Sequence, residues 1–200
     1  MIELVFVIVV LGILASLAMG RMDRDLKQEA SETILSHIRL AQQLALRDNK
    51  HRGDNNATWQ KAYWQIDFDC TSGCKYTVGS DLNLNGSFEM LESAIDPTDG
   101  KYLLNDGTDT DMSEKVLLEK KFGIHSIVSS LGDSIGFDYL GRPHVDISSS
   151  TNTFSQIMQT DCNLTFTMST DADNDGSDDE FVITIRAETG HSFIVGQEGS

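Results

Sequence analysis

Basic residues are scarce in this chain of 200 residues, which has 15 Lys and Arg against 31 Asp and Glu. The formal charge of −16 argues against a nucleic-acid-binding face, because contacts with phosphates require clustered Lys and Arg. No Lys or Arg precedes Arg21, so the positively charged start of a secretory signal peptide is missing. No A-x-A cleavage site follows the apolar N-terminal run, and we therefore expect this segment to be retained.

Catalytic motifs are also missing. No histidine stands in H-E-x-x-H spacing, and none lies beside a G-x-S-x-G nucleophile turn. The sequence therefore predicts that the protein is not an enzyme. The histidines are scattered along the chain: His37, His51, His125, His144 and His191.

Cysteine is limited to three residues, which suits an oxidising compartment without requiring one. Cys70 and Cys74 flank a short turn that would bring them near bridging distance. We expect a disulfide between them, although the sequence equally allows either to pair with Cys162.

The N-terminal segment has one acid, Glu3, ahead of an apolar run from Leu4 to Met19. As a helix this run would span roughly 24 Å, against about 30 Å for the hydrocarbon core of a bilayer. A buried carboxylate costs several kcal/mol unless it is paired. Because the chain offers no cation before Arg21, we expect the partner of Glu3 to lie on another molecule.

Beyond Asp25 the helical pattern continues but becomes amphipathic. We therefore predict an N-terminal helix over 1–49, with an apolar membrane and assembly stem at 1–20 and an amphipathic half at 21–49. The apolar positions of that half recur every three or four residues: Leu26, Ala30, Ile34, Ile38, Ala41 and Ala45.

The remainder, 50–200, reads as a β-rich globular head in which short β-branched or aromatic runs alternate with Gly-containing turns. The predicted fold class is α+β, a long N-terminal helix packed on one antiparallel sheet. The expected strands are Ala62–Phe68, Lys115–Phe122, Ser134–Tyr139, Asn163–Met168, Phe181–Arg186 and His191–Val195.

The string from Ile2 to Ala15, IELVFVIVVLGILA, resembles the N-terminal segment of type IV pilins and of type II secretion pseudopilins. By this resemblance Glu3 pairs with the N-terminal amine of a neighbouring subunit in a filament. The leader and the Phe-Thr that usually precede the apolar run are absent, and we expect the natural chain to begin further upstream. Gly20 stands where many pilins have a helix-kinking proline.

The segment Ile38–Asn49 resembles the corresponding stretch of H-type minor pseudopilins and T-type minor pilins, with Gln42 in place of the usual Arg. The resemblance implies a minor structural subunit with a single-pass inner-membrane anchor and a periplasmic head, which later enters a periplasmic or surface filament. The implied partners are other pilin or pseudopilin subunits, the inner membrane and the assembly machinery. A membrane-anchored, calcium-dependent adhesive or ligand-binding head is the alternative.

Two acidic loops follow calcium-loop spacing. The first matches D-x-[DN]-x-[DN]-G-x₅-E, in which alternating oxygen-bearing side chains converge on one cation. A polar hairpin turn explains the same residues without an ion. The candidate calcium ligands of the first loop are Asp81, Asn83, Asn85, Ser87 and Glu92.

The second loop has the same D-x-D-x-D-G opening but no acid at its twelfth position. Closure of a calcium site would therefore have to come from the acids that end the loop. A polar turn is again the simpler alternative. The candidate ligands are Asp171, Asp173, Asp175, Asp179 and Glu180.

Overall fold

The computed structural model describes residues 2–52, 57–106, 110–145, 147, 157–171 and 176–197. Within the N-terminal helix it describes the side chains of 3–14 and 26–47. The helical elements are α1 (Ile2–Arg47), α2 (Leu118–Phe122) and the short 3-10 helices η1 (Ala57–Ala62), η2 (Met90–Glu92) and η3 (Glu114–Val116).

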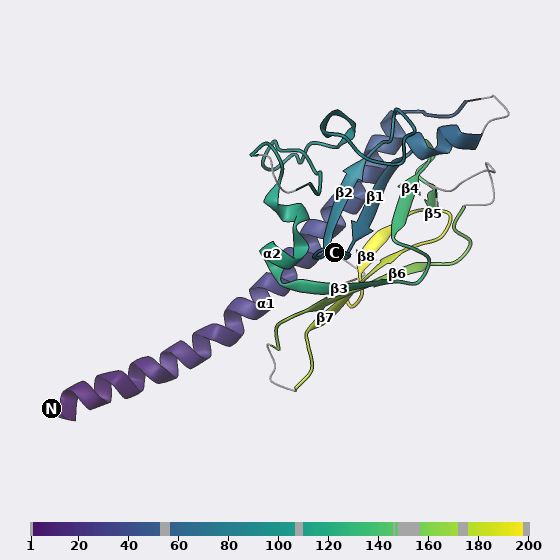
Figure 1. The fold of residues 1–200 in the computed structure, drawn as a ribbon. Coiled ribbons are helices and arrows are strands. Elements are labelled where there is room, and N and C mark those ends of the chain that lie inside the picture. The colour runs from purple at the N-terminus through teal and green to yellow at the C-terminus, as the bar shows by residue number, and fades with distance from the viewer. Residues whose placement is uncertain are drawn as a thin grey trace.

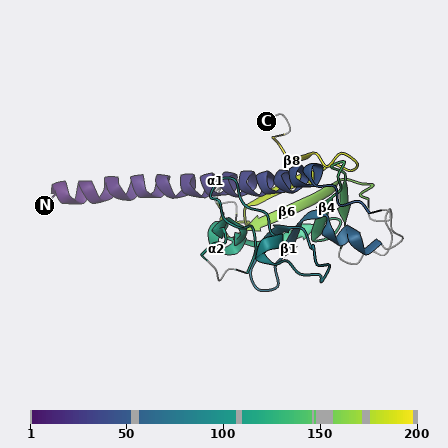
Figure 2. The ribbon, with the colours of Figure 1, turned by 90° about the horizontal axis from the view of Figure 1, so that it is seen from above.

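Helix α1 has two halves with different surroundings (Figures 1 and 2). Its N-terminal half extends away from the rest of the chain, whereas its C-terminal half packs against strands of both sheets. The segment is rich in Leu and Ala and contains no proline, so the helix runs unbroken. The predicted apolar stripe of the second half is confirmed, because these side chains are buried: Ala30, Ile34, Ile38, Ala41 and Ala45.

Among the described residues, eight strands form two four-stranded sheets, and the strand pairings within both sheets are antiparallel. The first sheet has the order β2-β1-β4-β5 and the second has the order β3-β6-β7-β8. The strands are β1 (Trp64–Asp69), β2 (Lys75–Gly79), β3 (Ile124–Ser129), β4 (Ser134–Phe137), β5 (Pro143–Val145), β6 (Cys162–Met168), β7 (Glu180–Ile185) and β8 (Ser192–Ile194).

The larger of two hydrophobic clusters among the described residues joins the two sheets to α1. The Phe68 ring of β1 lies 5.7 Å from the Phe166 ring of β6, and Phe166 stacks on Phe181 of β7 at 4.9 Å. Burying each such ring contributes about 1.5–3 kcal/mol relative to leaving it exposed. The sheets therefore belong to one folding unit.

The predicted fold class is wrong in two respects. The head contains two antiparallel sheets rather than one. Strand β3 pairs with β6, and these two strands belong to a sheet separate from that of β1, β2, β4 and β5. The second correction concerns the membrane stem. In the part of the chain that the structure describes, no helix combines the length and the apolar character needed to cross a bilayer.

This finding also corrects the predicted transmembrane character of the protein and its predicted single-pass location in the inner membrane. The physical reason is already present in the length of the apolar run. Sixteen helical residues span roughly 24 Å, which is shorter than a hydrocarbon core of about 30 Å.

Candidate functional site

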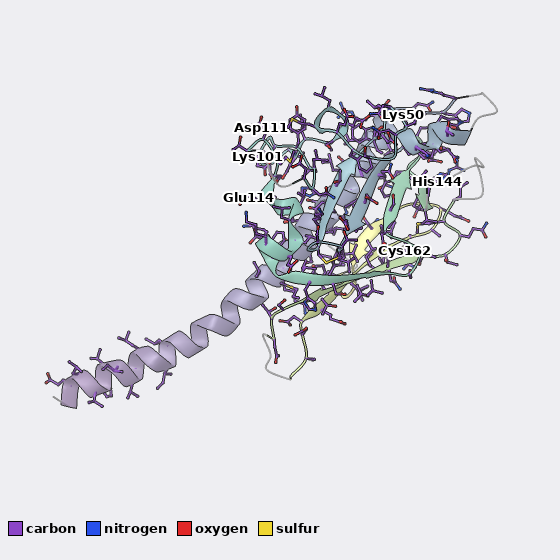
Figure 3. The ribbon with its side chains drawn as sticks, viewed as in Figure 1. Lys50, Lys101, Asp111, Glu114, His144 and Cys162 are labelled. Carbon is purple, nitrogen blue, oxygen red and sulfur yellow. A yellow bond between two sulfur atoms is a disulfide. The ribbon has the colours of Figure 1, made fainter. Side chains whose placement is uncertain are left out.

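The N-terminal part of α1 presents an uncovered apolar surface. Every described side chain from Glu3 to Leu14 is exposed, including Leu4 at 66%, Phe6 at 69% and Ile8 at 59%. The side chains project on all sides of the helix (Figure 3). Soluble proteins rarely leave contiguous apolar surface uncovered unless it mediates an interaction.

Glu3 lies in the first turn of α1, at the end furthest from the sheets. In this position its negative charge also favours the helix through the macrodipole. Among the described residues no ion pair involves Glu3. Its pairing with another subunit therefore stays a prediction.

A buried polar cluster fixes the C-terminal half of α1 to the head, and the sequence analysis missed it. His37 of α1 has its Nδ1 atom 2.5 Å from the Tyr76 hydroxyl of β2 and its Nε2 atom 3.5 Å from an Asp96 oxygen. Lys115 donates to the same Asp96 oxygen at 2.8 Å. The sequence feature that could have indicated this cluster is His37, a polar residue next to the apolar stripe of an amphipathic helix.

The charges of this cluster are set by burial and by hydrogen bonds. Burial is the main cause that lowers the pKa of His37, so the ring is neutral near pH 7. Burial by itself would raise the pKa of Asp96, but hydrogen bonds from Lys115 and Thr98 outweigh it and bring the value to about 2. The cluster is therefore a neutral histidine beside a carboxylate–ammonium pair.

A second buried carboxylate, Asp138, organises the turn between β4 and β5. It accepts hydrogen bonds from Arg142 Nε at 2.7 Å and from the backbone N–H groups of Leu140 and Arg142 at 2.9 Å, and His144 Nε2 lies 3.3 Å away. These hydrogen bonds outweigh burial and lower the pKa of Asp138 to about 2. Neither Asp138 nor His144 was among the predicted site residues.

The first acidic loop is closed by its own backbone. Asp81 accepts from the N–H groups of Asn85 and Gly86 at 3.1 and 2.8 Å. Glu92 accepts from the N–H groups of Leu82 and Asn83 at 2.9 and 3.1 Å. Both carboxylates are buried, so hydrogen bonds hold the loop in shape and calcium binding stays a prediction.

Of the three other predicted ligands of this loop, Asn83 and Asn85 make local turns, and Ser87 donates to the second of them. The Asn83 amide oxygen accepts from the N–H of Asn85 at 3.0 Å, and the Asn85 amide oxygen accepts from the N–H of Ser87 at 2.8 Å. The structure thus brings the predicted residues together in one loop. The hairpin-turn interpretation and the calcium interpretation both fit this arrangement.

The described acids of the second loop contact other protein groups. Asp171 accepts from the N–H of Gly176 at 3.0 Å, Asp179 lies 3.6 Å from Lys27, and Glu180 accepts from Thr167 at 3.1 Å. The remaining two predicted ligands, Asp173 and Asp175, lie outside the described residues.

Cys70 and Cys74 form a disulfide, and Cys162 is a free, buried thiol at the start of β6. The bridge closes the turn between β1 and β2, where Cys74 is buried and Cys70 is exposed. The sequence allowed either Cys70 or Cys74 to pair with Cys162, but in the structure the two pair with each other.

Within the described ranges, no three or more His, Cys, Asp and Glu side chains are grouped so that they could hold a metal ion. Comparison of the chain with models of protein families, with characterised proteins and with experimentally determined structures finds no match.

Proposed function

We propose that the chain is a structural subunit of a filament of the type IV pilin or type II secretion pseudopilin kind, and that it assembles through its N-terminal helix. The observation that carries this proposal is the exposure of every described side chain from Glu3 to Leu14. Burial of this segment releases about 25 cal/mol per Å² of apolar surface. The resemblance of the Ile2–Ala15 string to pilin segments supports the same function.

The partners in this proposal are copies of the chain or similar subunits. The exposed segment is about 18 Å long and is apolar on all its faces, so it can be surrounded by several neighbouring helices at once. Glu3 is its only charge. In a packed bundle of helices this carboxylate requires a positive partner, which would set the axial register of the subunits.

Substitution within the exposed segment tests the proposal. Ile8→Asp introduces a charge in the middle of the apolar surface and should abolish filaments in sedimentation and electron microscopy of the full chain. Leu91→Asp is the matched control, because Leu91 is 86% exposed and belongs to η2 of the head. Filament formation by Ile8→Asp at the level of the unchanged chain would refute the proposal.

Glu3 is tested separately. Glu3→Ala should leave the head folded and reduce filament yield, because the subunits lose their pairing charge while keeping the apolar surface. Glu3→Asp should restore part of the yield, since the charge is retained on a shorter side chain. Equal yields from Glu3→Ala and the unchanged chain would contradict a pairing role for this residue.

A further inference from the structure

One end of the head, next to the C-terminus of α1, has an exposed apolar surface with a basic border. We call it the distal surface, and it consists of Leu46, Arg47, His51, Arg52, Tyr139 and Leu140. These residues lie together because Gly141, next to Leu140, packs against the Leu46 side chain, and the Tyr139 ring lies 6.0 Å from the His51 ring. Leu46 and Leu140 are 54% and 56% exposed.

The basic border stands out on a chain with a formal charge of −16. Arg47 and Arg52 are both exposed, and neither forms an ion pair with any described residue. Lys50, labelled in Figure 3, lies at the same end of the head and pairs with Asp48 at 2.6 Å. Within the described residues, this end of the molecule therefore offers two positive charges without an ion-pair partner, beside exposed apolar side chains.

A groove of about 530 Å³ lies where α1 enters the head. We call it the proximal groove, and the lining residues used here are Lys27, Glu180, Phe181, Val182, Ile194 and Val195. Val195 is 51% exposed in it. Glu180 of the lining is exposed, and so is Asp178 two residues before it, which lies 3.6 Å from His125. Lys27 of the lining pairs with Asp179 at 3.6 Å, so the groove combines an apolar lining with a net acidic charge.

The two surfaces lie at opposite ends of the part of α1 that packs on the head. Lys27 lines the groove and Arg47 belongs to the distal surface, which places them 20 helical residues, or about 30 Å, apart. Surfaces separated in this way cannot meet within one molecule. A contact between two different surfaces of identical chains is heterologous, and it generates an open filament when the rotation between copies does not close a ring.

We propose that the distal surface of one copy docks into the proximal groove of the next copy, so that the heads stack head to tail. The exposed leucines enter the apolar groove, and Arg47 and Arg52 face Asp178 and Glu180. This inference rests on the proposed filament function and adds a specific contact between heads. Complementary charge sets the orientation of the stack, because reversed heads would bring like charges together.

Engineered cysteines in the full chain test the contact directly. Leu140→Cys and Val195→Cys each add one exposed thiol, whereas the natural Cys162 is buried and the other two cysteines are bridged. Under an added oxidant, a mixture of the two single variants should give a cross-linked dimer, and the double variant should give a ladder of oligomers. Leu140→Cys combined with Leu91→Cys is the control and should give no ladder.

Reversal of the charges on the two surfaces is the second test of the contact. Arg47→Glu with Arg52→Glu should lower the filament yield about tenfold or more, because like charges then meet. Adding Asp178→Lys and Glu180→Lys in the same chain should restore it. Lys101→Glu with Lys120→Glu changes the net charge equally and should leave the yield unchanged. Lys101 lies on a different side of the head from Lys50 (Figure 3).

The outcomes separate this inference from the function on which it rests. Filaments that form without a ladder, or that tolerate the Arg47 and Arg52 reversal, overturn the head-to-tail contact and leave the filament function standing. An unchanged chain that forms no filaments under any condition overturns the function, and the contact with it.

Discussion

The Nδ1 atom of His37 lies 2.5 Å from the hydroxyl of Tyr76, so α1 and β2 are joined through two buried side chains. With the ring proton on Nε2, towards Asp96, the Nδ1 atom accepts the hydrogen bond from Tyr76. The helix that carries the assembly surface is thereby fixed in rotation relative to the head. Rotation of the helix would break the hydrogen bond between the two buried groups His37 and Tyr76, whereas Asp96 would keep those from Lys115 and Thr98.

Tyr76→Phe should therefore lower the free energy of unfolding by about 1–3 kcal/mol, because the buried His37 Nδ1 loses its donor while the core keeps its volume. Denaturant unfolding followed by circular dichroism measures the change. Tyr139→Phe is the control, since Tyr139 is 36% exposed and should change stability by only a few tenths of a kcal/mol. Equal effects from the two substitutions would contradict the role assigned to the buried pair.

Asp67 of β1 should make the protein less stable at neutral pH. Burial, followed by the charges of Asp69 and Asp133, raises the pKa of Asp67 from 3.8 to about 6. A raised pKa in the folded state gives stability that is complete below about pH 4 and is lost as the pH rises through about 6. Asp67→Asn should thus raise the free energy of unfolding at pH 7 by on the order of 2 kcal/mol, with little change near pH 3.5.

Asp69 on the same strand is the matched control with the opposite sign. Hydrogen bonds from the side chain and the backbone of Thr71 lower the pKa of Asp69. Its contribution is present above pH 4 and is lost as the pH falls. Asp69→Asn should therefore give no gain at pH 7, and a gain equal to that of Asp67→Asn would show that burial of Asp67 is not the cause.

The helix and most strands could be predicted from local pattern, whereas the pairing of strands could not. The stripe from Ala30 to Ala45 and the alternation in β6 are properties of single segments. The division into two sheets depends on contacts between segments far apart in sequence, such as β3 with β6. The buried cluster around His37 was missed for the same reason, since His37 and Tyr76 are 39 residues apart. The cluster around Asp138 is local, with partners two to six residues away, and was missed although its residues stand close together in the sequence.

The segment Lys115–Phe122 shows how a local pattern can mislead. Its hydrophobic content predicted a strand, but the structure has η3 and α2 there. Leu118 and Phe122 are both buried and stand four residues apart, which is helical spacing. Gly123 then ends the helix in the left-handed conformation, at φ 72°.

The loop of Asp81 and Glu92 should depend on both carboxylates even when calcium is withheld. Each accepts two backbone hydrogen bonds across the loop while buried, so Asp81→Ala should cost about 1–3 kcal/mol in a chelating buffer. Thermal unfolding with chelator and with added calcium measures this cost. Ser87→Ala, on the exposed side of the loop, is the control. No loss from Asp81→Ala in chelator would mean that these hydrogen bonds do not hold the loop.

Calorimetry with calcium tests the remaining prediction for this loop. If the loop binds the ion, heat should be released with the unchanged chain and be lost in Asp81→Ala. The second loop is tested in the same way with Asp171→Ala. Equal calcium heats from all three proteins would remove both loops as sites.

At the junction of α1 with both sheets, Gly190 should be the glycine that least tolerates an added side chain. A Cβ atom at this position would lie 2.5 Å from the Gly141 carbonyl oxygen and 2.5 Å from the Gln42 side-chain nitrogen. That nitrogen donates to the carbonyl oxygens of Gly141 and Thr189, both at 2.9 Å, so Gln42 joins the helix to turns of the two sheets. Gln42, which stands where the similar pilin segments usually have Arg, therefore makes this contact between the helix and the two turns.

Gly190→Ala should lower the free energy of unfolding by about 1–3 kcal/mol more than Gly100→Ala. Both glycines have positive φ, 67° and 72°, so the cost of placing a side chain in the left-handed conformation is common to the two variants. Gly100 has no atom within 4 Å of the added Cβ, and the difference therefore isolates the close approach at Gly190. Denaturant unfolding of the two variants gives this difference. Equal losses would show that the helix–turn junction can relax around the added methyl group, and that Gln42 does not hold the two turns at a fixed separation.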